Sequence, residues 1–301
     1  MNIKLKSKLQ VHLLMVVAVG LAASSFPIGA LITNELSPAI LMFIRFSVAT
    51  VLFAPFVIFK YGIKLPGKQR IIHYVLLSIP LVIFFWCMFE SLRYTSVLNT
   101  GALNTTVPAM TAVYAYFINK ETSGKSRTIG LLLGTAGALW IVFRGDVNAL
   151  LSLQLNYGDF IFIVGCLCLG LYNPLVKRFY KGEPMVVITF WVLFFSSILL
   201  LIVSGWELGQ VEWGQIDSNV YIAIFYLAFF ATLITFYLIN YCTIKLGPTK
   251  VAAYSFLTPM FVITMSLIIG LEQFEYITIP GLLLIIVGMF FIQKGANKIR
   301  S

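Results

Sequence analysis

Residues 99–141 read NTGALNTTVPAMTAVYAYFINKETSGKSRTIGLLLGTAGALWI, and residues 250–292 read KVAAYSFLTPMFVITMSLIIGLEQFEYITIPGLLLIIVGMFFI. One constant offset of 151 residues aligns the two stretches without a gap. It pairs Ala102 with Ala253, Pro108 with Pro259, Ile118 with Ile269, Glu121 with Glu272, Gly130 with Gly281, Gly137 with Gly288 and Ile141 with Ile292. Shared apolar composition accounts for matched leucines, but poorly for a proline, a glutamate and two glycines in one frame. The pattern indicates an internal duplication.

The composition is that of a protein whose surface faces lipid. The chain has 301 residues, of which 60% are hydrophobic and only 11% charged, with a mean hydropathy of +0.95. Soluble domains carry about 25% charged residues. We therefore expect an all-α polytopic membrane protein.

Ten segments are long and apolar enough to cross a hydrocarbon core of about 30 Å as helices. They lie near residues 11–32, 38–59, 71–92, 97–118, 127–143, 158–176, 185–204, 219–244, 250–270 and 276–293. The first resembles a signal peptide, because three lysines precede an apolar run that ends in small residues. It continues to Ile32 and has a counterpart in the sixth segment, so we expect a retained helix.

The basic residues test this count independently. With ten spans, all of the 21 lysines and arginines except Arg45, Arg93 and Arg144 fall on one side. The other side collects acidic residues, namely Glu35, Asp146, Asp159, Glu207, Glu212, Asp217, Glu272 and Glu275. The positive-inside rule places both termini in the cytoplasm. We expect the protein in the inner or plasma membrane. The net charge of +10 follows from these connections and does not indicate nucleic-acid binding.

Two copies of five helices must cross the membrane in opposite senses, since five is odd. We expect an inverted repeat, with residues 1–150 as the first half and 151–301 as the second. The loop after the repeated proline helix carries Lys120, Lys125 and Arg127 in copy one, but Glu272 and Glu275 in copy two. At the start of each half, residues 24–28 can be laid on residues 171–175, and Pro38 pairs with Pro184. In such transporters the substrate site lies at midplane between the halves.

The motifs resemble a known family. They are Ser37-Pro38 before Arg45-Phe46, then residues 91–96 leading to Pro108, and residues 243–248 leading to Pro259 and a helix with Gly281 and Gly288. This pattern is similar to EamA-type members of the drug/metabolite transporter superfamily, over nearly the whole chain. Many members have a Trp-Gly pair and a lysine in the first helix, where this chain has Ala22-Ala23 and Ile28-Gly29-Ala30. A substrate contact made by that lysine therefore does not transfer.

Two charged residues fall inside the spans. Glu90 shares a helix face with Trp86 and Arg93, so it either binds a proton or a cationic substrate group, or pairs with Arg93. Arg45 lies about two turns into the second span and either binds substrate or holds helices together. The third span is strongly aromatic, with Phe84, Phe85, Trp86 and Phe89. These rings would suit a cation–π contact to an amine substrate, or would simply pack or face lipid.

Polar side chains gather before the two repeated prolines and in the sixth and eighth spans. In lipid they need partners, which another helix or a ligand can supply. We expect them to line a central cavity. With the residues above, the candidates for substrate or proton binding are Glu90, Trp86, Arg45, Asn104, Thr105, Pro108, Tyr172, Asn173, Tyr237, Asn240, Tyr254, Ser255, Thr258 and Pro259.

Glycines recur at Gly130, Gly134 and Gly137 and again at Gly281 and Gly288, which predicts close helix contact within the chain or a homodimer through these helices. Cys166 and Cys168 point to nearly opposite sides of a helix, so we expect no metal there and no cofactor. No phosphate-binding Gly-Lys-Ser/Thr loop is present, which argues against ATP as the energy source.

The sequence thus predicts a secondary transporter, not an enzyme, that alternates access to a central cavity. We expect it to export a small organic metabolite such as an amino acid or an amphiphilic amine, with a proton as a candidate coupling ion. The alternatives are a membrane-embedded enzyme and a passive channel.

Overall fold

The computed structural model describes residues 3–62, 65–122, 124–148, 155–271, 273, 275–294 and 298–299. Glu272 and the predicted boundary between residues 150 and 151 lie outside these ranges. The helices are α1 (Ile3–Ala23), α2 (Ser25–Ile32), α3 (Pro38–Tyr61), α4 (Lys68–Ser91), α5 (Val97–Leu103), η1 (Asn104–Thr106), α6 (Val107–Asn119), α7 (Lys125–Val142), α9 (Tyr157–Phe179), α10 (Met185–Ser204), η2 (Leu208–Gln210), η3 (Trp213–Gln215), α11 (Ser218–Ala228), η4 (Phe229–Ile234), α12 (Thr235–Leu246), α13 (Pro248–Ala252), η5 (Ala253–Leu257), α14 (Thr258–Ile269) and α15 (Thr278–Lys294).

These helices form the ten predicted spans. Seven continuous helical segments in the described ranges are long and apolar enough to cross a membrane, and α15 is a shorter apolar helix. The segment α5–η1–α6 and the helix α7 complete the set. A short antiparallel pair joins β1 (Glu121–Thr122) to β2 (Lys298–Ile299). The all-α class and the ten-span count are confirmed.

Local sequence explains where the helices begin and end. Ser37 accepts a hydrogen bond from the backbone N–H of Ile40 at the start of α3, and Pro38 occupies the first turn, where a missing N–H costs nothing. Asn156 and Asp159 form a reciprocal capping box at the start of α9. Helix α12 ends at Gly247, whose φ of 90° is open to glycine without a Cβ penalty.

Four spans of the described chain are interrupted in ways that the hydropathy pattern did not predict. The first span is divided at Ser24 into α1 and α2. The fourth and ninth contain the 3₁₀ segments η1 and η5 just before Pro108 and Pro259. In the eighth span, η4 is a stretch of π-helix. Such irregular turns leave backbone groups outside the α-helical ladder, which in lipid is tolerated where a cavity or a polar side chain meets them.

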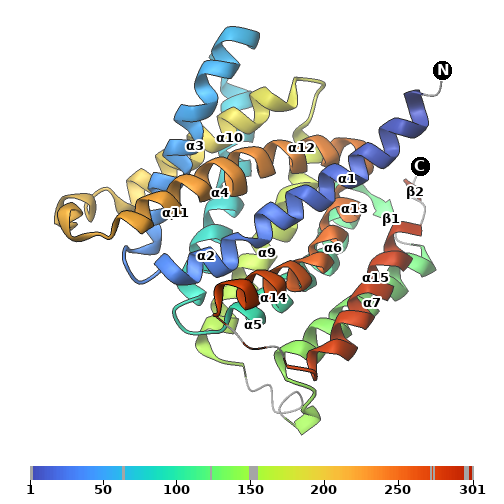
Figure 1. Cartoon of the computed structure of the whole chain (residues 1–301). Coiled ribbons are helices and arrows are strands. Elements are labelled where there is room, and N and C mark those ends of the chain that lie inside the picture. Colours follow the sequence, from blue (N-terminus) through green and yellow to red (C-terminus); the bar gives the residue numbers. More distant parts are fainter. Residues whose placement is uncertain are drawn as a thin grey trace.

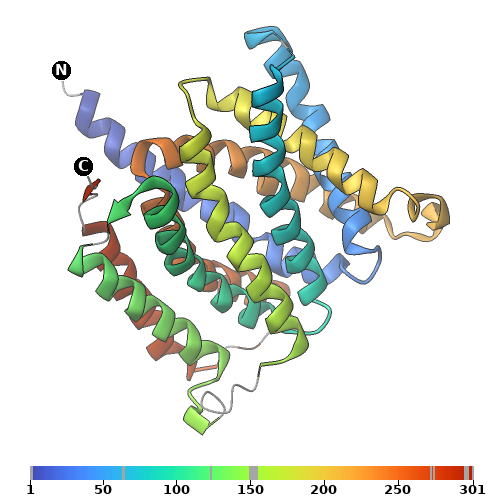
Figure 2. The same cartoon turned by 180° about the vertical axis from the view of Figure 1, so that it is seen from behind.

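The two five-helix repeats surround a common core. Helices α3 and α10 pack together at one edge of the bundle, and α7 and α15 at the opposite edge (Figure 1). Between them α4 packs on α9, while α1 packs on α12 and α14. The views from both sides place the two termini near each other (Figure 2). We call this end of the bundle the terminal end and the other the distal end.

Glycine contacts between α7 and α15 show that the repeats are inverted. A Cβ built on Gly130 would lie 2.5 Å from the carbonyl oxygen of Gly288, and one on Gly137 would lie 2.5 Å from that of Gly281. The two helices therefore run antiparallel. Because the repeat pairs Gly130 with Gly281 and Gly137 with Gly288, a two-fold rotation exchanges the two contacts.

These contacts also decide the role of the glycines. The glycine faces of α7 and α15 are covered by each other within one chain, so close helix contact is the alternative that holds. Within the chain, the backbones of α7 and α15 already touch at these glycines. A dimer through other surfaces stays untested.

Candidate functional site

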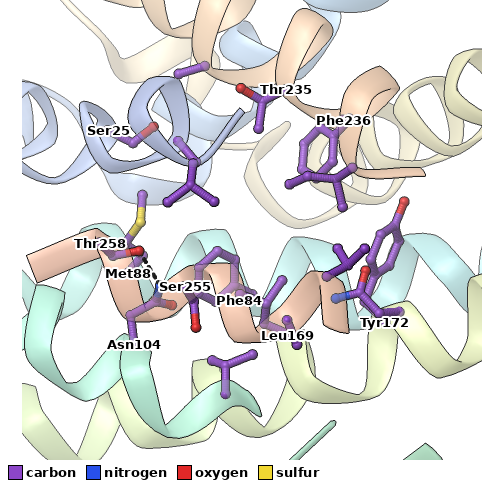
Figure 3. Close-up of a pocket in the computed structure, with 18 of the residues that line it drawn as sticks. Ser25, Phe84, Met88, Asn104, Leu169, Tyr172, Thr235, Phe236, Ser255 and Thr258 are labelled. Carbon is purple, nitrogen blue, oxygen red and sulfur yellow. Dashed lines mark hydrogen bonds between the residues drawn. The ribbon is translucent and has the colours of Figure 1, made fainter. Parts of the chain in front are cut away.

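A cavity of about 100 Å³ lies in the middle of the bundle, where the two repeats meet (Figure 3). Helices of both halves form its wall, with Ser25, Thr235 and Phe236 on one side and Asn104, Ser255 and Thr258 on the other. The full lining is Met15, Val19, Ala22, Ser25, Phe26, Phe84, Phe85, Met88, Asn104, Val107, Leu169, Tyr172, Asn173, Ala231, Thr235, Phe236, Ile239, Val251, Ala252, Ser255 and Thr258.

The wall repeats itself between the halves. The offset of 151 residues relates Asn104 to Ser255 and Val107 to Thr258, and all four residues line the cavity. The same offset, extended upstream, relates Phe84, Phe85 and Met88 to Thr235, Phe236 and Ile239, which also line it. At the start of each half, Ala22, Ser25 and Phe26 correspond to Leu169, Tyr172 and Asn173. The cavity is therefore built on the two-fold relation between the repeats.

Two polar groups of the wall are left without protein partners. Asn104 donates its amide N–H to Thr258 Oγ1 at 3.2 Å, while its carbonyl oxygen Oδ1 has no partner in the described residues. The hydroxyl of Ser255, the repeat equivalent of Asn104, has none either. Buried polar atoms normally make hydrogen bonds, and an unpaired one is costly. These two atoms are therefore available to a ligand or to water.

The 3₁₀ geometry explains which polar residues face the cavity. Three residues per turn bring Ser255 and Thr258 onto one face and turn Tyr254 away. The Tyr254 hydroxyl instead bonds His12 on α1, and Tyr254, which we expected to line the cavity, is not part of its lining. Thr105, next to Asn104, donates back to the carbonyl of Ala102 at 2.7 Å.

The remaining polar candidates lie behind the wall. Asn240 accepts a hydrogen bond from the Tyr172 hydroxyl at 2.9 Å and donates to Thr189 Oγ1 at 3.0 Å. It holds the ring of Tyr172, which does line the cavity. Pro108 and Pro259 are buried in the first turns after the 3₁₀ segments and set the helix direction, while Tyr237 lines a separate pocket of the terminal end.

Arg45 is fully buried just outside the cavity. Its Nε donates to Thr232 Oγ1 at 2.6 Å, and Nη2 donates to Ser25 Oγ and to the carbonyl of Ala231, each at 3.1 Å. Its Cζ lies 4.7 Å from the centre of the Phe85 ring. Ala231 and Thr232 belong to the π-helix η4, so Arg45 bonds to an interrupted part of that span.

Glu90 and Trp86 are not in the cavity. Trp86 is 39% exposed on the surface of the bundle. Glu90 Oε2 lies 3.4 Å from Arg93 Nη1, and the Glu90 side chain is 16% exposed. Arg93 also donates to the carbonyl oxygens of Thr33 and Leu36. The structure thus contains the ion pair that was one alternative for Glu90, and the pair joins α4 to the loop after α2.

We therefore expect Glu90→Gln to leave the pH dependence of transport unchanged. The lost pair is partly exposed, so the free energy of unfolding should fall by about 0–1 kcal/mol. Flux measured in proteoliposomes between mildly acidic and mildly alkaline pH, with melting temperature as a parallel readout, checks both statements. A pH profile that flattens in the variant would restore Glu90 as a proton site.

Of the residues that the sequence singled out, Asn104, Tyr172, Asn173, Ser255 and Thr258 line the cavity, and Arg45 lies just outside it. Ser25, Thr235 and Phe236 were not singled out, because one hydroxyl or one ring in an apolar span is common. A signal did exist: the offset of 151 residues continues upstream of residue 99 and pairs Phe85 with Phe236. These rings are in edge contact, with centres 5.7 Å apart, close to the two-fold axis.

Ten membrane-spanning helices in two inverted halves, with a shared cavity at their junction, define a polytopic membrane protein. A family model described as the EamA-like transporter family matches residues 9–143 and 156–293, one match in each half. The chain belongs to this family, within the drug/metabolite transporter superfamily, and is a multi-pass membrane protein.

Similar proteins agree with this assignment. The chain is 26% identical over 247 residues to the "Uncharacterized transporter YyaM" of Bacillus subtilis, covering 81% of each chain. It is 24% identical to the "WAT1-related protein At3g02690, chloroplastic" of Arabidopsis thaliana, over 68% of this chain and 50% of that one. A solved crystal structure has the same fold, with a TM-score of 0.73 over 95% of this chain and 98% of the other, at 16% identity.

Proposed function

We propose that this protein is a secondary carrier of the cell membrane that exports a small organic metabolite by alternating access. The observation that carries the proposal is the cavity wall, to which equivalent positions of both repeats contribute. In carriers built from inverted repeats, one half rocks against the other around a site near the midplane. Under this proposal the positive-inside rule keeps both termini in the cytoplasm.

Bonds between the repeats at each end would serve as the alternating closures. At the terminal end Glu121 pairs with Lys177 at 2.7 Å, and Arg70 pairs with Glu183 at 2.7 Å. At the distal end Thr95 donates to Asp159 at 2.7 Å. Ser37 also bonds to Glu207 there. Each of these pairs joins the first repeat to the second, so opening either end requires breaking such contacts while the other end keeps its own.

The substrate class follows from the wall. Apolar and aromatic side chains dominate the lining, and the few polar groups include an amide oxygen and a hydroxyl without partners. This combination fits a small solute with both an apolar part and hydrogen-bonding groups, such as an amino acid or an amphiphilic amine.

Flux in proteoliposomes tests the carrier proposal. Purified protein is reconstituted and loaded with an unlabelled metabolite from a panel of amino acids and amines, and uptake of the labelled form is followed. A carrier gives saturable uptake and accelerated exchange when the unlabelled solute is present inside. A flux that rises linearly with concentration and shows no counterflow would contradict alternating access and favour a channel. The direction of transport is tested by comparing the rate of outward flux with the rate of inward flux at equal concentration gradients.

A further inference from the structure

The guanidinium of Arg45 is a buried cation without a counter-ion. Arg45 is 0% exposed, and no carboxylate in the described part of the chain forms an ion pair with it. By contrast, Arg70, Arg93 and Arg144 each pair with a glutamate. An isolated charge in a medium of low dielectric constant is unfavourable, and buried charges are normally paired.

The hydrogen bonds of Arg45 use only part of its donor capacity. A guanidinium has five N–H groups in a planar fork. Bonds to Thr232, Ser25 and Ala231 engage Nε and Nη2, whereas Nη1 has no partner among the described residues. The bonds of Nε and Nη2 are enough to hold α3 against η4. They leave the two N–H groups of Nη1 unused, and they do not neutralise the positive charge of the guanidinium.

The same guanidinium touches the wall of the central cavity. Ser25 and Ala231, which accept hydrogen bonds from Nη2, both line the cavity, and so does Phe85, whose ring lies under Cζ. Figure 3 shows Ser25 at the edge of the cavity, across from Asn104 and Thr258. An anionic group bound against Ser25 would therefore lie next to the unpaired charge.

The other lining residues supply no competing charge. Among the described residues that line the cavity there is no aspartate, glutamate, lysine or arginine. A cationic solute would meet the field of Arg45 without any carboxylate to offset it. An anionic one would meet the unpartnered N–H groups of Nη1, which can donate charge-assisted hydrogen bonds to a carboxylate.

We propose that the transported solute carries a carboxylate and that Arg45 supplies its counter-charge. This inference rests on the carrier function proposed above and narrows its substrate class. It selects amino acids and other organic acids over amphiphilic amines. The unpartnered Asn104 Oδ1 then accepts a hydrogen bond from a donor group elsewhere on the same solute.

Matched ligands test the inference on the unmodified protein. The full-length protein is purified in detergent and titrated with a panel of amino acids and other organic monocarboxylates. The corresponding carboxamides and decarboxylated amines form the comparison panel, with the shift of the melting temperature as the readout. We expect at least one acid to bind roughly 30-fold or more tightly than its amide, as for loss of one partner of a desolvated charge pair. Amides or amines that bind as well as the acids, or a panel in which no acid binds, would overturn the inference.

Variants of two buried arginines test whether Arg45 supplies the counter-charge. Arg45→Gln is expected to bring the ratio of acid to amide affinity close to one, and Arg45→Lys to keep a preference for the acid at reduced affinity. Arg127→Gln is the matched control, because Arg127 is also buried but is not among the residues that line the cavity. It should keep the wild-type ratio even if the protein becomes less stable. An Arg45→Gln protein that folds and keeps the wild-type ratio of acid to amide affinity would contradict the assigned role, as would an Arg45→Lys protein that loses all preference for the acid.

Should Arg45→Gln fail to fold, the lysine variant and the ligand pairs still decide the matter. The two proposals also fail separately. Acids that bind with the expected preference but are never exchanged across the proteoliposome membrane contradict the carrier function and leave the charge assignment intact. Saturable counterflow of amines, with no preference for acids, would support the carrier function and contradict the role assigned to Arg45.

Discussion

Gly288→Ala is expected to prevent stable folding, although it adds a single methyl group. The new Cβ would lie 2.6 Å from the carbonyl oxygen of Gly130 and 2.7 Å from the backbone nitrogen of Gly134. Both are main-chain atoms of α7 and cannot rotate away, so α7 and α15 would have to separate along their whole contact. Overpacking of this kind typically costs 1–3 kcal/mol, and we expect about 3 kcal/mol or more here. Thermal melting in detergent and the yield of monodisperse protein on size exclusion measure the effect.

Two further alanine variants serve as controls. Gly137→Ala should behave like Gly288→Ala, because the two-fold relation places Gly137 against the carbonyl oxygen of Gly281 at 2.5 Å from a built Cβ. Gly20→Ala should be tolerated, since its Cβ would meet only the Phe261 ring at 3.4 Å, and alanine is the better helix former. A Gly288→Ala protein that melts at the wild-type temperature would show that α7 and α15 are not packed as described.

Ala22→Phe is expected to abolish solute exchange while the protein still folds. Ala22 lines a cavity of about 100 Å³ and is the repeat equivalent of Leu169, so its side chain projects where the solute would bind. Benzene alone fills an engineered cavity of about 150 Å³. A phenylalanine ring at this position therefore leaves no room for a substrate. We expect counterflow in proteoliposomes to fall to the background level of empty liposomes.

Val17→Phe on the same helix is the matched control. Val17 is exposed on the outer face of α1, where a larger apolar side chain meets lipid. Its exchange rate and melting temperature should both remain close to those of the wild type. If Ala22→Phe exchanged solute normally while folded, the central cavity would not be the transport site, and the proposed mechanism would fail with it.

The gross architecture was predictable because lipid imposes simple rules. Each span must satisfy its backbone hydrogen bonds internally, so length and hydropathy locate helices such as α3 and α10 to within a few residues. The constant spacing of 151 residues between matching glycines and prolines then revealed the duplication. The antiparallel contact of Gly130 with Gly288 bears out the inverted orientation, which parity alone had required.

The details of the site were less predictable, because they depend on contacts between distant spans. Tyr254 and Ser255 were both expected to line the cavity, yet only Ser255 does, because the two neighbours point to different sides of the 3₁₀ helix η5. Asn240 turned out to hold Tyr172 and not to line the cavity. Hydropathy does not distinguish a polar side chain that faces a cavity from one that bonds a neighbouring helix.

The asymmetry of one position has a consequence for energetics. The cavity wall is duplicated, but the repeat equivalent of Arg45, by the alignment of Pro38 with Pro184, is Trp191, a buried ring stacked near Tyr74. In the proposed mechanism, the state open to one side of the membrane becomes the state open to the other side when the two halves exchange conformations. A carrier with two identical halves would therefore bind its solute with equal affinity from both sides. A charge present in one half only removes that equality. If access alternates as proposed, the protein would bind its solute more tightly when open to one compartment than when open to the other, with the same helices moving in both directions.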